Sequence, residues 1–568
     1  YAEGQMILKD DVSGKQLHIF YNEDGLMERI ADNSGREAVI TYNGEDLVSF
    51  TNADGQKETF VYDGSHHLIC GTDALGIPYV ENTYDDKGRI LTQKEGGNGT
   101  EAVLSYEETP DGEMTVHVRN HNGETMSVTT NSKGEKIRET DEAGAVTEYT
   151  YDDVGNLLTE KDNEGNIAHY AYDEEGKLIA YANKAGETTS LSYDAKGYVA
   201  SVMEEDGTGT RFTYDETGAL LRKISPLGAV TRYAYDEYGN AVRQVDDGLG
   251  TVAMTYEDGL LTGMTDHNGN LTTFGYDEWG NRCLQTDAMG NRMETVYDET
   301  GKVLLEKGFD GTVTACTYDA KGQKTEETVR GEDGSTRTVR YVYDGMGRVV
   351  EMTNEAGTTA YTYDSMNRVT AVANAIGVKE SYTYNAQGLL AESRNGSDEK
   401  TVYEYDAAGR IIKQKDSLGT ISYTYDKNGN VLNVTDKNGT ISRQYDSLNR
   451  VTSVTDYKGD TIRYAYDQLG NRVSITYPGG EKVRYAYYKD GNLKSVTDKD
   501  GNVTYYTYDE NGRLTETERG DGSREKRTYD AAGQLLSVRD ETAAGEVINE
   551  YAYEYDGRGN IIRINGME

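Results

Sequence analysis

Short runs of alternating apolar and polar residues fill this chain from end to end. Residues 166–173, NIAHYAYD, and 156–162, NLLTEKD, are typical, and they contain extended segments of about six or seven residues that are rich in Thr, Val, Tyr and Leu. These residue types favour extended backbone, and a period of two places every second side chain on the same face of a sheet. The pattern therefore predicts an all-β chain of many short strands.

Two turn signals separate the strands within each unit of the pattern. In residues 151–171 the first signal runs from Asp152 to Gly155 and the second from Asp162 to Gly165. Asp at the first position and Gly at the fourth are typical of a type I turn followed by a left-handed residue, a common hairpin loop with a glycine bulge. Each unit is therefore predicted to contain two antiparallel strands and two turns.

The unit repeats about every 21 residues, and the dipeptide Tyr-Asp marks the same point in it 19 times. Degenerate copies such as Tyr256-Glu257 and Tyr384-Asn385 keep the register, which gives about 26 copies along the 568 residues. We predict a structural role for the residues that define the repeat, namely Tyr151, Asp152, Gly155, Tyr172, Asp173, Tyr193, Asp194, Tyr214, Asp215, Tyr235, Asp236, Tyr425, Asp426, Tyr466, Asp467, Tyr508 and Asp509.

The spacing of the repeat stretches at three places. Between Tyr106 and Tyr151 the dipeptide Thr130-Asn131 stands where a Tyr-Asp copy is missing. The other two intervals run through residues 318–343 and 529–555. The stretched spacing predicts longer loops in these places.

A second aromatic residue often lies two positions before the tyrosine of Tyr-Asp, as Tyr149 does before Tyr151 and Tyr170 before Tyr172. Both rings then point to the same face of the sheet and form ladders of amphipathic rings. The chain has 47 Tyr beside only 6 Phe, so the hydroxyls are expected to meet water or polar groups rather than a dry core. The favoured role of the ladder is a scaffold, and a stacking platform for sugars is the functional alternative.

A meander of roughly 50 strands cannot stay flat, because right-handed twist accumulates and sheets beyond about ten strands curl, split or close. We predict a long antiparallel hairpin ribbon that coils into a hollow spiral shell or tube. A parallel β-helix is the second choice, since its corners need no pair of tight hairpin signals. A propeller is the third, since it would need about thirteen blades instead of the usual four to eight.

The domain organisation follows from the repeat. Residues 1–568 are expected to form one continuous repeat array, with divergent repeats in 1–130 and regular repeats in 131–568. Because the chain begins at Tyr1 and ends partway through a motif, we expect it to be a segment of a longer protein. An export signal would then lie upstream of these residues.

Net charge excludes some classes of partner. The 99 Asp and Glu against 58 Lys and Arg give a formal charge of −41, which repels phosphate backbones and anionic lipids. Nucleic acid is therefore not an expected partner. No apolar run approaches the roughly 18 residues of a membrane span, so no direct span is expected either. The acidic residues gather in the turns, which explains the charge as part of the repeat.

Candidate chemistry is scarce. The three cysteines are an odd number at unrelated spacings, which supports neither a disulfide framework nor a zinc site. His66 and His67 would face opposite ways on a strand, and the acidic runs 426–430 and 498–502 are better explained as hairpin turns than as calcium loops. No nucleotide-binding or hydrolase motif is present. We therefore predict no catalytic, cofactor-binding or metal-ligating residue, and no enzyme.

Residues 405–440, YDAAGRIIKQKDSLGTISYTYDKNGNVLNVTDKNGT, resemble the RHS or YD-repeat family, which includes bacterial polymorphic toxins, toxin-complex cocoon subunits and animal teneurins. The resemblance implies a spiral β-ribbon around a hollow interior. In bacterial members it also implies a C-terminal toxin domain that an aspartyl-protease-like closing core cuts free. This sequence contains no Asp-Pro pair, so neither the closing core nor a toxin domain is expected within it.

Two functional hypotheses follow from the repeat and the resemblance. The favoured one is a non-catalytic shell that encapsulates a toxin cargo carried by the same longer polypeptide, in a secreted or cell-surface protein. The alternative is a cell-surface adhesion or carbohydrate-binding module. Cell-surface glycans and a secretion apparatus are further candidate partners.

Overall fold

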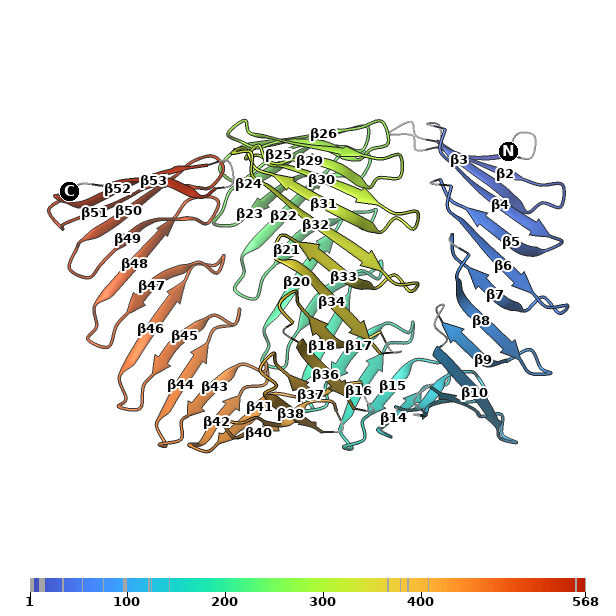
Figure 1. Cartoon of the computed structure of the whole chain (residues 1–568). Coiled ribbons are helices and arrows are strands. Elements are labelled where there is room, and N and C mark those ends of the chain that lie inside the picture. The colour runs from blue at the N-terminus through green and yellow to red at the C-terminus, as the bar shows by residue number, and fades with distance from the viewer. Residues whose placement is uncertain are drawn as a thin grey trace.

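The computed structural model describes the whole chain except residues 1–4, 10–15, 33–34, 54, 75, 96–99, 121–122, 124, 142–143, 365–366, 378, 386–387, 407, 557–558 and 567–568. The described residues form 53 β-strands in one sheet, with no helix among them (Figure 1). Accordingly, no helix in this part of the chain could cross a membrane. The all-β prediction and the expected number of about 50 strands are confirmed.

Most strands have five or six residues, and the longest have nine. Their bounds are β1 (Gln5–Lys9), β2 (Gln16–Tyr21), β3 (Met27–Asp32), β4 (Glu37–Asn43), β5 (Asp46–Thr51), β6 (Lys57–Tyr62), β7 (Leu68–Thr72), β8 (Pro78–Tyr84), β9 (Ile90–Glu95), β10 (Thr100–Glu108), β11 (Met114–Arg119), β12 (Thr125–Thr130), β13 (Lys136–Thr140), β14 (Val146–Tyr151), β15 (Leu157–Lys161), β16 (Ile167–Tyr172), β17 (Leu178–Ala182), β18 (Thr188–Tyr193), β19 (Val199–Met203), β20 (Gly209–Tyr214), β21 (Leu220–Ile224), β22 (Val230–Tyr235), β23 (Ala241–Asp246), β24 (Thr251–Glu257), β25 (Leu260–Thr265), β26 (Leu271–Tyr276) and β27 (Arg282–Thr286). The remaining strands are β28 (Arg292–Tyr297), β29 (Val303–Lys307), β30 (Val313–Tyr318), β31 (Lys324–Arg330), β32 (Thr336–Tyr343), β33 (Val349–Asn354), β34 (Gly357–Tyr363), β35 (Val369–Ala373), β36 (Lys379–Tyr384), β37 (Leu390–Arg394), β38 (Lys400–Tyr405), β39 (Ile411–Lys415), β40 (Thr420–Tyr425), β41 (Val431–Asp436), β42 (Gly439–Tyr445), β43 (Val451–Thr455), β44 (Thr461–Tyr466), β45 (Arg472–Thr476), β46 (Lys482–Tyr487), β47 (Leu493–Thr497), β48 (Val503–Tyr508), β49 (Leu514–Glu518), β50 (Arg524–Tyr529), β51 (Leu535–Glu541), β52 (Val547–Tyr555) and β53 (Ile561–Gly566).

Each strand pairs antiparallel with the strand before it and the strand after it in the chain, so the sheet is one meander. The turns have the geometry that the Asp-x-x-Gly signals predict. At the first turn of the 151–171 unit, the Asp152 N–H donates to the Asn156 carbonyl (3.0 Å), and the Gly155 N–H donates to the Asp152 carbonyl (3.2 Å). Gly155 has a φ of 98°, in the left-handed region that glycine enters without a steric penalty.

The left-handed position gives a prediction about stability. At Gly470 (φ 84°) an added Cβ would meet nothing closer than the Arg450 Cδ at 3.9 Å, so Gly470→Ala changes only the backbone preference. We expect it to destabilise the β44–β45 hairpin by about 1–2 kcal/mol. Asn449 holds the same turn position one repeat earlier at φ 60°, consistent with the greater tolerance of asparagine for the left-handed region.

Amide hydrogen exchange of β44 and β45 measures this difference, because single hairpins of a repeat array open locally. The Gly470→Asn variant is the control, since asparagine tolerates the left-handed region better than alanine. Unchanged exchange in Gly470→Ala would contradict the assignment of this turn.

A β-bulge recurs beside the tyrosine of Tyr-Asp. In the pair β14–β15, Thr150 lies opposite Thr159 but Tyr151 lies opposite Leu157, so Leu158 is an extra residue. The same shift occurs at Tyr235 in β22–β23 and at Tyr466 in β44–β45. Bulges increase local right-handed twist and bend the sheet, so one bulge per repeat curves the ribbon in a regular way.

The stretched intervals of the repeat contain longer strands, so the prediction of longer loops was wrong. β31 and β32 have seven and eight residues and stay paired from Glu326–Arg340 to Arg330–Thr336. β51 and β52 lengthen in the same way. Residues added to both strands of a hairpin extend the ladder of backbone hydrogen bonds, whereas residues added to a loop would leave those groups unpaired.

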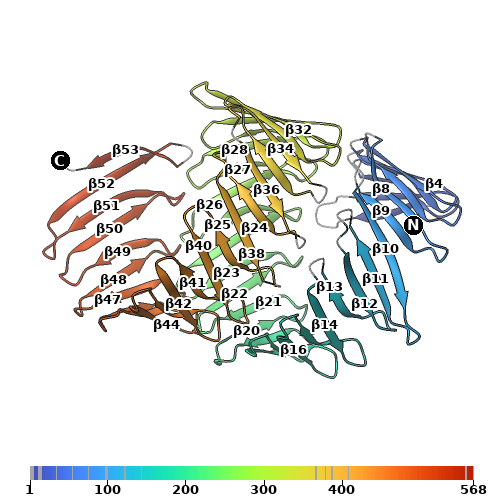
Figure 2. The same ribbon diagram turned by 60° about the horizontal axis from the view of Figure 1, so that its bottom comes forward.

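The ribbon coils, and its turns meet turns that lie about one coil away in the sequence. Hydrogen bonds join residues separated by 263 (Arg36 to Glu299), 246 (Arg410 to Glu164) and 245 (Asn511 to Asp266) positions. With repeats of about 21 residues, one coil therefore takes about twelve repeats. Figures 1 and 2 show the successive coils as the colour runs from blue to red. The predicted coiled ribbon is confirmed, and the sheet does not close on itself.

The ribbon has little dry core. Five apolar side chains are buried among the described residues, and they are Ile19, Ala168, Val230, Cys316 and Ala371. No large side chain in the described part is completely buried. Strand pairing, half-buried tyrosines and polar contacts between turns must therefore carry the stability of the sheet.

Candidate functional site

At most Tyr-Asp corners the tyrosine ties its strand to the preceding one. The pairing of β17 with β18 ends at Ala180 and Ser190, which leaves the Leu178 carbonyl beyond the end of that ladder. The Tyr193 hydroxyl donates to this carbonyl at 2.7 Å. The hydroxyl thus takes the place of a main-chain donor, as buried backbone acceptors require.

The same bond recurs along the chain. Among the predicted repeat residues, it joins Tyr151 to Lys136 O, Tyr214 to Val199 O, Tyr235 to Leu220 O, Tyr425 to Ile411 O and Tyr466 to Val451 O. Tyr172 ends β16, and Tyr508 ends β48, where its ring meets Tyr488 edge to face. Where Thr130 replaces the tyrosine, its hydroxyl donates to the Met114 carbonyl at 3.4 Å.

The aspartate of each corner caps the turn. In Asp152 the Oδ1 atom accepts the N–H groups of Val154 (3.0 Å) and Asn156 (2.8 Å), two and four residues further on. The same pair of bonds occurs at Asp173, Asp194, Asp215, Asp236, Asp426, Asp467 and Asp509. The Asp side chain therefore holds two backbone donors that no strand partner reaches.

These bonds favour the charged carboxylate. The Asn156 side chain and then the Asn156 backbone N–H, both donors to Asp152, lower the pKa of that carboxyl below its ordinary value. The Asn240 side chain lowers the pKa of Asp236, and the Thr217 side chain lowers the pKa of Asp215. Hydrogen bonds donated to a carboxylate stabilise its ionised form.

Acid is therefore expected to unfold the ribbon from the turns. A carboxyl whose pKa is lower in the folded state stabilises fully above its unfolded pKa of about 3.9, and this contribution is lost as pH falls through the folded pKa. Thermal unfolding followed by circular dichroism should show the midpoint falling steeply below about pH 4. Asp152→Asn provides the control, because Asn131 caps its turn through the same two bonds without a titrating group. A midpoint unchanged down to pH 2 would contradict this role.

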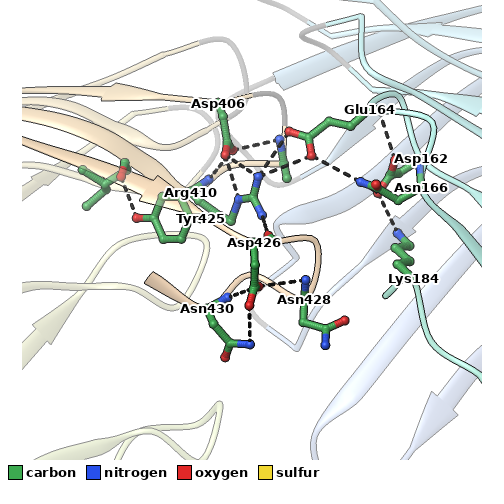
Figure 3. Close-up of polar contacts among 12 residues, drawn as sticks. Asp162, Glu164, Asn166, Lys184, Asp406, Arg410, Tyr425, Asp426, Asn428 and Asn430 are labelled. Atoms are coloured by element: carbon green, nitrogen blue, oxygen red, sulfur yellow. Dashed lines mark hydrogen bonds and ion pairs between the residues drawn. The ribbon is translucent and has the colours of Figure 1, made fainter. Parts of the chain in front are cut away.

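The residue after the turn glycine links one repeat to the next. The Arg410 Nε donates to Asp406 Oδ2 (2.7 Å) in its own turn, and its Nη1 donates to the Asp426 carbonyl (3.2 Å) of the next repeat (Figure 3). Its guanidinium also lies over the Tyr425 ring, 4.9 Å from the centroid. Arg348, Arg450 and Arg513 make the equivalent three contacts.

Some repeats have Arg at this position and others have Asn, and the sequence alone indicated no role for either. Asn430 donates to Asp426 Oδ2 (2.9 Å) in its own turn and to Asn449 Oδ1 (2.6 Å) in the next repeat. Arg410 differs because it reaches a backbone carbonyl and a tyrosine ring of the next repeat. The sequence feature that could have revealed this role is an arginine that follows one Tyr-Asp tyrosine by five residues and precedes the next by about fifteen. The guanidinium covers one face of the tyrosine ring, which reduces the ring surface open to other ligands.

The two edges of the ribbon differ and meet head to tail. We call the edge formed by the Tyr-Asp turns the Tyr-Asp edge, and the edge formed by the other turns the second edge. Arg410 on the Tyr-Asp edge pairs with Glu164 on the second edge at 3.2 Å (Figure 3). Asn511 donates to Asp266 at 2.7 Å across the same boundary.

Other coil boundaries have the same polarity. Lys321 on the Tyr-Asp edge pairs with Asp73 on the second edge at 2.5 Å, and Asn428 donates to Glu187 at 2.9 Å. Each coil thus seats its Tyr-Asp edge on the second edge of the coil before it. These contacts join residues 36–73 to residues 299–321, and residues 164–268 to residues 410–511.

The histidine pair lies in a turn, so the expectation that both residues sit on a strand was wrong. His66 takes the left-handed position (φ 66°) that glycine holds elsewhere, and its Nδ1 lies 2.9 Å from Asp46 Oδ1. His67 Nδ1 lies 3.0 Å from Asp63 Oδ2. Within the described ranges, no three His, Cys, Asp or Glu side chains gather as metal ligands would.

Comparison with known proteins assigns the repeat. A family model described as Teneurin YD-shell matches four overlapping or adjoining stretches, residues 67–206, 98–262, 264–393 and 391–524. These stretches cover most of the chain. A search of curated protein sequences finds no match.

Solved structures share the fold at low sequence identity. The Photorhabdus luminescens Tc holotoxin pore with the mutation TccC3-D651A matches with a TM-score of 0.65 and 13% identity over 95% of this chain and 39% of that chain. The crystal structure of TcdB2-TccC3-TEV matches with a TM-score of 0.62 and 14% identity over 98% of this chain and 37% of that one. This chain therefore spans less than two fifths of those proteins. The chain belongs to the Teneurin YD-shell family of RHS/YD-repeat proteins, and it is a shell-like repeat module.

Proposed function

We propose that this chain is the non-catalytic wall of a shell that encloses a polypeptide cargo, a toxin domain carried by the same longer protein. The observation that carries the proposal is that each coil seats its Tyr-Asp edge on the second edge of the coil before it, at separations of 241 to 264 residues. Such a wall excludes proteases and binding partners from the space behind it by steric means alone.

The comparisons support a toxin as the cargo. The solved structures with this fold include a Tc holotoxin pore and complexes of TcdB2 with TccC3. On this proposal the chain's own residues perform no reaction, and the full protein is secreted or displayed at the cell surface. The predicted continuous array, with divergent repeats in 1–130 and regular repeats in 131–568, forms one wall.

A carbohydrate-binding role has less support. The Tyr-Asp tyrosines Tyr425 and Tyr466 donate their hydroxyls to backbone carbonyls, and arginine guanidiniums lie over their rings. A stacking platform for sugars needs open ring faces.

Limited proteolysis of the natural longer polypeptide tests the proposal. We expect the cargo to resist a protease that digests the same cargo domain when it is free, and the Arg410→Glu variant, which opposes Glu164 at a coil boundary, to restore digestion. Arg340→Glu, on a strand away from the coil boundaries, is the matched charge-reversal control. Equal digestion of the cargo in the intact protein and in its free form would overturn the proposal.

A further inference from the structure

The face of the sheet opposite the tyrosines carries a group of exposed arginines. Arg222 on β21 lies directly opposite Arg232 on β22. Ala234 is two residues after Arg232 and points to the same face, and Arg243 on β23 lies opposite Ala234. Arg211 on β20 lies opposite Ile224 on β21, on the same face as Arg222. All four side chains are exposed.

The next coil continues this group. Arg463 and Ala465 point to the same face of β44, and Ala465 lies opposite Ser474 on β45. Ser474 also lies opposite Arg484 on β46, so Arg463 and Arg484 point to the same face of the sheet. Each lies 252 residues after a counterpart, Arg211 or Arg232, which is about one coil. We call these six arginines the basic patch: Arg211, Arg222, Arg232, Arg243, Arg463 and Arg484.

The two parts of the basic patch adjoin at a coil boundary. A cavity there is lined by Ser225 and Val230, from the β21–β22 hairpin, and by Leu469 and Lys489, from the turns before β45 and β47. Figure 1 shows β20–β23 in green next to the orange strands of the following coil. The patch therefore extends across two coils of the wall.

Positive charge in the basic patch is not balanced by nearby acids. Strands β18–β23 contain one acidic residue, Asp246, and it lies on the tyrosine face opposite Thr231. Strands β42–β47 contain none. Arg232 pairs with Asp247 at 3.2 Å, whereas the other five arginines form no ion pair with a carboxylate in the described part of the chain. This stands out in a chain with a net charge of −41.

Elsewhere the same face carries opposite charges across the strands. Lys161 pairs with Glu148 at 2.9 Å, and Lys413 pairs with Glu404 at 2.9 Å. Like charges directly opposite each other, as in Arg222 and Arg232, destabilise a sheet. Folding alone does not require this pair, so its counter-charge is expected to come from another molecule.

We propose that the basic patch binds an acidic segment of a partner polypeptide through its Asp and Glu carboxylates. Arginine presents a planar fork of N–H donors that fits a carboxylate in bidentate geometry, and all six positions are Arg rather than Lys. Nucleic acid is disfavoured because strands β18–β23 place their aromatic rings on the other face, where they could not stack on bases bound at the basic patch.

Fluorescence anisotropy with a labelled deca-glutamate peptide and the full chain tests the proposal. We expect saturable binding that weakens at least tenfold in the double variant Arg222→Gln/Arg232→Gln and is lost at about 0.5 M salt. The matched control is Arg340→Gln, an exposed arginine on β32 that already pairs with Glu326 at 2.7 Å, and it should bind the peptide like the parent chain.

The fold of the double variant is checked by its thermal midpoint, which should stay close to that of the parent chain, because removal of the like-charge pair offsets loss of the exposed Arg232–Asp247 ion pair. Three results would overturn the proposal: no saturable binding of the peptide, equal loss in the double variant and in Arg340→Gln, or tighter binding of a single-stranded oligonucleotide of equal charge that displaces the peptide.

Discussion

Replacing Tyr466 by alanine is expected to destabilise the hairpins around β44 by about 2–3 kcal/mol. The change removes a half-buried ring, the hydroxyl bond to the Val451 carbonyl (2.7 Å) and the surface on which the Arg450 guanidinium lies, 5.1 Å from the ring centroid. The carbonyl is then left beyond the end of its ladder without a donor. Hydrogen exchange of β43–β45 amides measures the loss.

The Tyr466→Phe variant separates the hydroxyl from the ring and is expected to lose about 1 kcal/mol. Tyr457→Ala is the matched control, because Tyr457 is 55% exposed in a turn on the second edge, and its loss should stay within about 0.5 kcal/mol. If Tyr466→Phe matched the parent chain, the hydroxyl would not be the group that ends the ladder.

Replacing Arg410 by alanine is expected to remove about 2 kcal/mol and to loosen a coil boundary as well as a repeat. One guanidinium contacts Asp406 in its own turn, the Asp426 carbonyl in the next repeat and Glu164 in the neighbouring coil. The Arg410 side chain is 23% exposed, so these charged bonds are only partly screened by water. Urea unfolding, with hydrogen exchange of the 162–166 turn, reports both effects.

The Arg410→Asn variant separates the contribution of Arg410 to its own turn from its contribution to the coil boundary. Asn430 shows that asparagine closes its own turn through the Asp side chain, so this variant should regain turn stability yet still expose the 162–166 turn to exchange. If Arg410→Asn protected that turn as well as the parent chain does, the arginine would not join the coils.

The hairpins were predictable because their signals are local. Asp152 and Gly155 specify a turn within five residues, and the alternation in 166–173 specifies a strand and its faces. The tyrosine ladder was also predictable, but the partner of its hydroxyl was not. The carbonyl that Tyr193 reaches is exposed by the end of a strand pairing fifteen residues earlier, which no spacing in the sequence announces.

Features that depend on several repeats at once could not be predicted from the sequence. The bulge at Leu158 depends on how two strands share a register, and the contacts of Arg410 depend on a repeat and a coil that are distant in the chain. One coil takes about 24 strands, so each strand contributes a rotation of about 15°. An error of about one degree per strand in a predicted rotation would therefore misplace the end of a coil by more than one strand. Only the coiling itself follows from twist.

Zero-length carbodiimide cross-linking of the full chain, read by mass spectrometry, tests the coiled wall most directly. Lys321 and Asp73 lie 2.5 Å apart across a coil boundary, so the account predicts a cross-linked peptide pair that joins residues 248 positions apart within one chain. The Lys321→Gln variant should lose this pair and keep the pair Lys161–Glu148 within one hairpin. Cross-links confined to neighbouring hairpins, with the 73–321 pair absent from the parent chain, would contradict the coiled wall.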